Sequence, residues 1–364
     1  MTVAEVGKLL EKLAPLHYAE DFDNVGLLVG NPNTPVNGIL VALDTLEEVV
    51  DEAIAKKCNL IVSFHPIIFN GLKKLTGTTY VERVVMKAIS NNIAIFAVHT
   101  ALDNSHIGVN AKICEVLGIH SPNVLLPKKG TIKKLVTHVP KVALNQLRNA
   151  LFEAGAGNVG NYSHCSFNLA GLGSFNPTEN SNPTIGEKGK IHFEDETQLH
   201  ITFESAKERE VLNALFKNHP YEEVAYEITT LDNNNQNIGM GMIGTLETPM
   251  EEEGFLKRLK ERMHTPIVRH SQLLGKKVKK VAVLGGSGAF AIHAAKKAGA
   301  DMYVTADVKY HQFYEAEKQL VVADIGHFET EQFTKNLLVD FLKEKIPNFA
   351  VTLSESNTNP IKYF

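Results

Sequence analysis

In Leu60-Ile61-Val62-Ser63-Phe64-His65-Pro66, a short apolar run leads directly into a histidine. Two other runs behave in the same way, since residues 93–98 precede His99 and residues 320–323 shortly precede His327. Short apolar runs of this kind are typical of buried strands in a parallel sheet. In such sheets, ligands bind beyond the carboxyl ends of the strands. We therefore expect these histidines to converge on one site.

Carboxylates accompany the histidines. Asp103 closes the segment that begins with His99, and Glu331 follows His327 by one helical turn, which places both side chains on one helix face. Imidazole and carboxylate donors without a cysteine suit zinc, iron or manganese better than an iron–sulfur cluster. The pattern therefore indicates a metal site.

Each candidate ligand also has a plainer explanation. His65 before a proline could be a turn residue, and Asp103 could shape a turn or cap a helix. Glu331 could complement a helix dipole, and its spacing from His327 arises easily by chance in a chain with 15 His and 41 Asp and Glu residues. The shared position of these residues after strands, in both halves of the chain, favours the metal site.

Strand and helix patterns alternate near the N-terminus. Apolar runs predict strands at 38–43, 60–64 and 93–98, and helical spacing predicts helices at 45–57 and 81–90. A β-α-β-α-β order with short connections is typical of a parallel sheet.

The same alternation recurs near the C-terminus. It predicts strands at 278–284, 301–305, 320–323 and about 350–353, helices at 289–298 and 311–318, and a last helix with Phe333, Leu337 and Phe341 on one face. We therefore predict an α/β fold in which two pseudo-repeated βαβ halves, residues 1–127 and 244–364, form one metal-binding core.

The segment 128–243 has a different pattern. Strands are expected at 134–138, within 155–189, at 200–204 and at 224–230, with helices at 142–154 and 207–218. This β-α-β-β-α-β order is that of a ferredoxin-like α+β domain. We expect it to be inserted into the core, which requires its two ends to lie close together.

Composition limits the classes of protein that fit. With 364 residues, 44% of them hydrophobic, the chain can form large cores in more than one domain. A formal net charge of -4 gives no basic field for nucleic acid. Three scattered cysteines suit a reducing compartment. The sequence has neither a secretory signal pattern nor an apolar run long enough to span a membrane, so we expect a cytoplasmic protein.

A glycine-rich stretch supports a rival hypothesis. Gly286-Ser287-Gly288-Ala289-Phe290-Ala291 follows a predicted strand and fits G-x-G-x-x-A, with Asp307 about 20 residues further on. This is the fingerprint of a dinucleotide site and would suit an NAD-dependent oxidoreductase. The alternative is a glycine turn needed only for tight packing of a strand against a helix.

The ordered motifs resemble the GTP cyclohydrolase 1 type 2 homologue family, a dinuclear-metal family that is also described as NGG-interacting-factor-like. The motifs are Asp23-Asn24-Val25-Gly26-Leu27, His65-Pro66-Ile67-Ile68-Phe69, His99-Thr100-Ala101-Leu102-Asp103, Thr305-Ala306-Asp307 with Tyr310-His311, and Gly326-His327 with Thr330-Glu331. The middle segment resembles the family's optional PII-like insert through His219-Pro220-Tyr221-Glu222-Glu223.

The resemblance implies two divalent metal ions, zinc first, with iron or manganese as alternatives. Position by position, it assigns His65, Asp103, His327 and Glu331 as ligands, with Glu331 bridging. Phe64 departs from the pattern, because the family commonly has a second histidine there. We therefore expect the second ion to bind more weakly, unless a neighbour such as His99 replaces the missing imidazole.

The resemblance also implies a homohexameric ring and hydrolysis of a small, nucleotide-like substrate. In such an enzyme His99 and His311 could move protons, since imidazole titrates near neutral pH. Asp307, with His311, would line the substrate side of the site. The alternative is a non-enzymatic metal-binding or regulatory ring.

Overall fold

The chain forms two units in the computed structural model, which describes residues 1–364. The first unit joins residues 1–127 with residues 236–364, and the second comprises residues 128–235. The second unit begins at the predicted residue but ends at Asn235 rather than at 243. The reason is that β10 (Gly239–Glu251) pairs with strands of the first unit on both of its sides.

The first unit contains two sheets. One has the strand order β1-β4-β3-β2-β15. Strands β2, β3 and β4 are parallel, as the N-terminal alternation predicts, and β1 is antiparallel to β4. The strands are β1 (Gly26–Val29), β2 (Ile39–Ala42), β3 (Leu60–Ser63), β4 (Ala94–Ala97) and β15 (Val351–Leu353).

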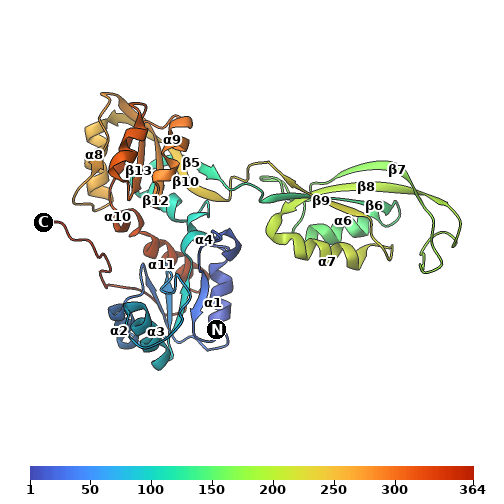
Figure 1. The fold of residues 1–364 in the computed structure, drawn as a ribbon, viewed down its shortest axis with the longest axis horizontal. Helices are drawn as coiled ribbons and strands as arrows, with labels where there is room; N and C mark the ends of the chain where they lie inside the picture. The colour runs from blue at the N-terminus through green and yellow to red at the C-terminus, as the bar shows by residue number, and fades with distance from the viewer. The chain divides into compact units, whose positions relative to one another are not determined.

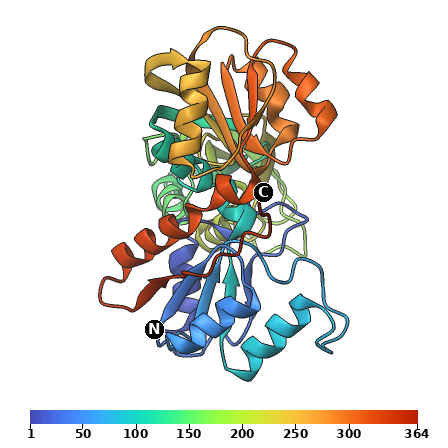
Figure 2. The same ribbon diagram turned by 90° about the vertical axis from the view of Figure 1, so that its left-hand side faces the viewer.

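The last strand, β15, differs from the prediction. The sequence placed it with the C-terminal half, but it pairs in parallel with β2 of the N-terminal sheet, with Val351 opposite Ile39. Figure 2 shows it in dark red beside the blue strands of that sheet. The preceding helix α11 (Thr334–Lys345) shares a hydrophobic core with the same strands, through Leu338 and Leu342. The C-terminal segment therefore completes the sheet of the other half.

The other sheet has the order β11-β14-β13-β12-β10-β5. Its strands are β5 (Ile119–Pro127), β10, β11 (Arg269–His270), β12 (Lys277–Ser287), β13 (Met302–Ala306) and β14 (Val321–Asp324). Strands β12, β13 and β14 are parallel. Strands β5 and β10 flank the second unit in sequence and pair with each other, with Pro127 opposite Gly239. This pairing holds together the two points between which the second unit is inserted.

Helices cover both sheets (Figure 1). One continuous core lies between the inward faces of the two sheets and takes in buried side chains of α1, α5, α8 and α11. Separate clusters bury the outward faces, beneath α2 and α3 in one sheet and beneath α9 in the other. The helices are α1 (Val3–Leu10), α2 (Glu47–Ala55), α3 (Tyr80–Ser90), α4 (His99–Asp103), α5 (Val109–Leu117), α8 (Glu252–Arg262), α9 (Ile292–Lys297) and α10 (His327–Glu331), with a 3-10 turn η1 (Leu16–Tyr18).

Two helices predicted in the C-terminal half are partly or wholly 3-10 helical. The first begins as a 3-10 turn, η3 (Ala289–Ala291), before α9. The second is a 3-10 helix, η4 (Tyr310–Ala316). It ends because Glu317 and Lys318 have φ values of 48° and 55°, which an α-helix does not allow. The longest helix, α11, has 12 residues, and none of the helices meets the length and apolarity that crossing a membrane requires.

The second unit has one antiparallel sheet of order β7-β8-β6-β9, and its elements follow the predicted order β-α-β-β-α-β. They are β6 (Ile132–Pro140), α6 (Leu144–Glu153), β7 (Phe167–Phe175), β8 (His192–Glu204), η2 (Ser205–Lys207), α7 (Glu208–Asn218) and β9 (Tyr226–Leu231). Helices α6 and α7 pack on one face of the sheet, around Leu135, Leu199 and Ile201.

Candidate metal centre

Polar side chains follow the carboxyl ends of the parallel strands in the first unit. Asp44 comes after β2, His65 after β3, His99 after β4 and Asp307 after β13. His327 begins α10, just beyond the end of β14. Except for Asp44, these are the positions that the sequence indicates, and the fold brings several of them together.

Three of the predicted ligands form one close group. The Nε2 atoms of His65 and His327 each lie 3.2 Å from Oε2 of Glu331. All three donor atoms lie within 4.8 Å of one another. The Glu331 side chain is almost fully buried, with 4% exposed. Two elements far apart in sequence, the end of β3 and the helix α10, therefore supply one potential metal site.

The remote nitrogen of each imidazole is held by a carboxylate. Nδ1 of His65 lies 2.8 Å from Oδ1 of Asp44, and Nδ1 of His327 lies 2.6 Å from Oδ2 of Asp307. An N–H at Nδ1 can donate to these acceptors, which leaves the Nε2 atom of a neutral ring with a lone pair. Carboxylates commonly fix metal-binding histidines in this way. Both rings therefore direct a potential donor atom toward Glu331.

Two buried carboxylate oxygens have no hydrogen-bond partner. One is Oε2 of Glu331, which receives no well-directed N–H despite the two nearby nitrogens, and the other is Oδ1 of Asp103. Leaving a buried acceptor unsatisfied costs about 1–3 kcal/mol, and more when it is charged. A cation bound at either oxygen would satisfy it. The residues present thus fit a metal ion by their donor chemistry.

Electrostatics lead to the same conclusion. Burial alone would lower the pKa of His65, but Asp44 and Glu331 raise it to about 10. Burial would likewise lower the pKa of His327, which Glu331 and Asp307 raise to about 9. Burial would raise the pKa of Glu331, which the two histidines lower to about 2. The carboxylates thus attract positive charge to the centre, and either protons or a metal ion can supply it.

Asp103 and Phe64 also belong to this part of the structure. Burial, and next the charge of Glu331, raise the pKa of Asp103 well above its ordinary value. Asp103 is outside the close group of three donors. Phe64 is fully buried, and its ring centroid lies 4.8 Å from that of His65 and 5.6 Å from that of His99. An apolar ring therefore lies beside His65 and His99, at the position where the resemblance implies an imidazole.

His99 has its own orienting carboxylate. Its Nδ1 atom lies 2.8 Å from Oδ1 of Asp23. The other oxygen of Asp23, Oδ2, accepts hydrogen bonds from the amide and hydroxyl of Thr100. Burial would raise the pKa of Asp23, but His99 and Thr100 lower it to about 2. The His99 and His65 ring centroids are 5.3 Å apart. The His99 ring therefore lies next to the close group of three donors, and Asp23 holds it in place.

The other two predicted catalytic residues differ in position. Asp307 accepts hydrogen bonds from His327 and from the Ser287 hydroxyl, so it orients a candidate ligand. His311 lies on η4, where its ring centroid is 5.1 Å from that of Tyr310 and 6.3 Å from that of Tyr314.

The glycine-rich loop has a local structural role. The amide of Gly285 donates to Oδ1 of Asn110, and the amide of Gly286 donates to Oγ1 of Thr330. A Cβ atom at Gly286 would lie 2.4 Å from Oε1 of Glu331, and its φ of +67° also favours glycine. These contacts support the packing explanation over the dinucleotide fingerprint, because a pyrophosphate would need those amides free.

Asp44 and Thr358 also belong to this network, and neither was predicted from the sequence. Asp44 orients His65 and also accepts a hydrogen bond from the hydroxyl of Thr358. Asp44 could have been found, since it closely follows a predicted strand just as His65 does. Thr358 gives no such signal, because only the path of the C-terminal segment brings it there.

Comparison with known proteins shows to which family the chain belongs. The model of the Duf34/NIF3 family (NGG1p interacting factor 3) matches residues 1–360. The chain belongs to this family. A Bacillus subtilis (strain 168) relative named GTP cyclohydrolase 1 type 2 homolog is 38% identical over 364 residues, covering 99% of this chain and 98% of the relative.

Solved structures agree with this family membership. The crystal structure of a Bacillus cereus protein related to NIF3 has a TM-score of 0.85 at 37% identity and covers 100% of this chain and 99% of that one. The crystal structure of a Staphylococcus aureus protein has a TM-score of 0.81 at 28% identity, with the same coverage.

Proposed function

We propose that this member of the Duf34/NIF3 family is a divalent-metal-dependent hydrolase that acts on a nucleotide-like or other small substrate. One observation carries the proposal. Two imidazole Nε2 atoms, each on a ring held by a carboxylate at Nδ1, face a buried Glu331 oxygen that has no well-directed donor. An arrangement of acceptors around one point is what a cation requires.

In this proposal His65, His327 and Glu331 hold the first ion, which is zinc, with iron or manganese as alternatives. Asp103 and Glu331 would hold a second ion, which would bind more weakly because Phe64 supplies no nitrogen. Three protein ligands leave a coordination position for water or substrate. When bound, the metal supplies an acidified water and polarises a carbonyl, imine or phosphoryl group.

The remaining residues orient ligands and move protons. Asp44 and Asp307 keep the two histidine ligands in the tautomer that directs Nε2 inward. Because Asp23 holds Nδ1 of His99, Nε2 of that ring is left to accept a proton from the attacking water. We propose His311 as a second proton carrier.

We extend the proposal to the organisation of the protein. The strand order of residues 128–235 supports a ferredoxin-like, PII-like insert. The resemblance seen in the sequence supports a homohexamer, and the scattered cysteines support a cytoplasmic location.

The test is turnover by purified protein that has been stripped with a chelator and reloaded with zinc, manganese or iron. A panel of nucleotides and phosphoesters serves as substrates. Turnover should require metal and be lost in His327→Ala and Glu331→Gln, while His293→Ala, which changes an exposed histidine on α9, keeps it. Metal binding without turnover of any substrate would favour the non-enzymatic alternative.

A further inference from the structure

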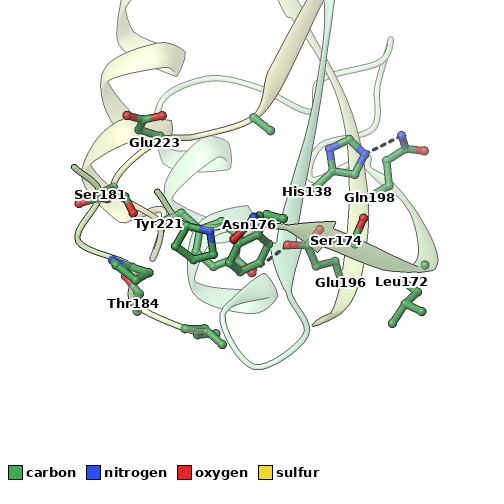
Figure 3. Close-up of a pocket in the computed structure, with 18 of the residues that line it drawn as sticks. His138, Leu172, Ser174, Asn176, Ser181, Thr184, Glu196, Gln198, Tyr221 and Glu223 are labelled. Carbon is green, nitrogen blue, oxygen red and sulfur yellow. Dashed lines mark hydrogen bonds between the residues drawn. The ribbon is translucent and has the colours of Figure 1, made fainter. Parts of the chain in front are cut away.

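The second unit contains a cavity of about 930 Å³, which is within the range of small-molecule sites. His138 of β6 and Glu196 and Gln198 of β8 form part of its lining (Figure 3). These side chains are on the face of the sheet opposite Leu135, Leu199 and the two helices, because neighbouring residues of a strand alternate in direction. The cavity is therefore separate from the packed core of this unit.

Hydrogen bonds fix the walls of the cavity. The loop that follows β7 is tied to the loop that follows α7, since the amide of Asn182 donates to Glu222 at 2.6 Å and the hydroxyl of Thr184 donates to the carbonyl of Pro220 at 2.8 Å. The hydroxyl of Tyr221 then donates to Oε1 of Glu196 at 2.8 Å, which joins this wall to the sheet. These hydrogen bonds therefore hold the loops around the cavity in place.

The lining is negatively charged. Glu196, Glu222 and Glu223 contribute carboxylates, and no lysine or arginine lines the cavity. The amide nitrogen of Gln198 lies 3.1 Å from Nε2 of His138. The Gln198 amide is oriented by His200, whose Nε2 lies 2.9 Å from the amide oxygen. A phosphate or carboxylate ligand would therefore find no opposite charge here.

The two carboxylate oxygens of Glu196 differ in their surroundings. Its Oε1 atom is engaged by Tyr221, whereas Oε2 lies over Gly173, where an added Cβ atom would approach it to 2.3 Å. A Cβ at Gly171, on the same face of β7, would meet nothing within 4 Å. The absence of side chains at these two glycines thus leaves room for the carboxylate and for the cavity. Leu169, Leu172 and Ile185 add apolar walls.

We propose that this cavity binds a small organic cation, with an amine or guanidinium group at Glu196 and an apolar body against the leucine and isoleucine walls. The half-buried Glu196 carboxylate, with Tyr221 on Oε1 only, can form a charge-assisted hydrogen bond to such a group through Oε2. The proposal is independent of the metal centre, because every residue that carries it belongs to the second unit.

The test is isothermal titration calorimetry of the full-length protein with tryptamine, agmatine and indole-3-acetate. Tryptamine and indole-3-acetate share a ring system and differ in charge. We expect saturable binding of at least one of the two amines, and none of the anion. Glu196→Gln should weaken amine binding by about tenfold or more.

Two further variants make the result specific. Gly173→Ala displaces the Glu196 carboxylate and should weaken binding as well. Glu204→Gln makes the same chemical change at the end of β8, outside the cavity, and should bind as the unmodified protein does. The proposal is overturned if neither amine binds saturably, if indole-3-acetate binds more tightly than tryptamine, or if Glu204→Gln weakens binding as much as Glu196→Gln. Thermal unfolding confirms that each variant is folded.

Discussion

Nδ1 of His327 lies 2.6 Å from Oδ2 of Asp307, although the two residues belong to different elements and are 20 positions apart. Asp307 adopts a φ of 55° immediately after β13, a conformation that is uncommon for a residue other than glycine. The Ser287 hydroxyl donates to the same Asp307 oxygen. The backbone and the hydroxyl together fix the carboxylate that orients the imidazole.

Asp307→Asn should weaken metal binding while leaving the protein folded. The amide keeps the size of the side chain but removes its charge, so it holds the His327 N–H less firmly. Loss of such an orienting carboxylate typically costs about 10–100-fold in metal affinity. Competition with a chromogenic chelator measures the effect, and Asp340→Asn, on the exposed side of α11, is the matched control. Equal affinity in the two variants would remove Asp307 from the metal centre.

Metal stoichiometry should reflect the phenylalanine at position 64. We expect one tightly bound divalent ion and one weaker ion, because only the first has two imidazole ligands. His65→Ala and Glu331→Gln should each reduce the metal retained after dialysis, as measured by elemental analysis. Phe64→His should increase retention of the second ion by supplying a nitrogen donor beside His65. If the double variant at His65 and Glu331 retains as much metal as the unmodified protein, the ligand set is wrong.

Thr358→Val should weaken metal binding, although Thr358 is not itself a proposed ligand. The Thr358 hydroxyl donates to Oδ2 of Asp44, whose other oxygen faces Nδ1 of His65. Valine keeps the shape of the side chain but leaves Asp44 less restrained, so we expect a loss of about 2–10-fold, the size of one hydrogen bond. Thr352→Val, on β15, is the control, and the same chelator competition applies. Unchanged affinity would show that Asp44 is positioned without the C-terminal segment.

The C-terminal segment should lose stability at acid pH, because Glu52 then becomes protonated. This carboxylate accepts hydrogen bonds from Lys56, from the hydroxyls of Ser354 and Ser356, and from the amide of Glu355. Burial would raise its pKa, but these donors lower it from 4.5 to about 2. The folded state therefore favours the ionised form. Its stabilising contribution is complete above about pH 4.5 and is lost as the pH falls toward 2.

Glu52→Gln should accordingly lower the free energy of unfolding by about 1–3 kcal/mol at neutral pH. The difference from the unmodified protein should shrink as the pH falls below 4.5, because protonation removes the same charge. Urea denaturation at a series of pH values measures both effects. A difference that stays constant from neutral to acid pH would mean that the charge of Glu52 has no part in it.

Local sequence pattern determined much of the framework. The apolar runs at 60–64 and 93–98 could be assigned as parallel strands because burial on both faces leaves a continuous apolar signal. His65 and His99 could then be placed at strand ends, and Glu331 could be paired with His327, because helical geometry fixes side chains one turn apart. These inferences need only neighbouring residues and the periodicity of regular structure.

Tertiary structure decided the rest, because contacts between distant segments leave no periodic trace in the sequence. The pattern at 350–353 predicts a strand but not its partner, and packing of α11 against the first sheet places Val351 beside Ile39. The same long-range path brings Thr358 to Asp44. The glycine fingerprint at 286–291 suggested a cofactor, whereas only the fold shows Gly286 closely packed against Glu331. Periodicity encodes which elements form, and the matching of buried surfaces decides which side chains meet.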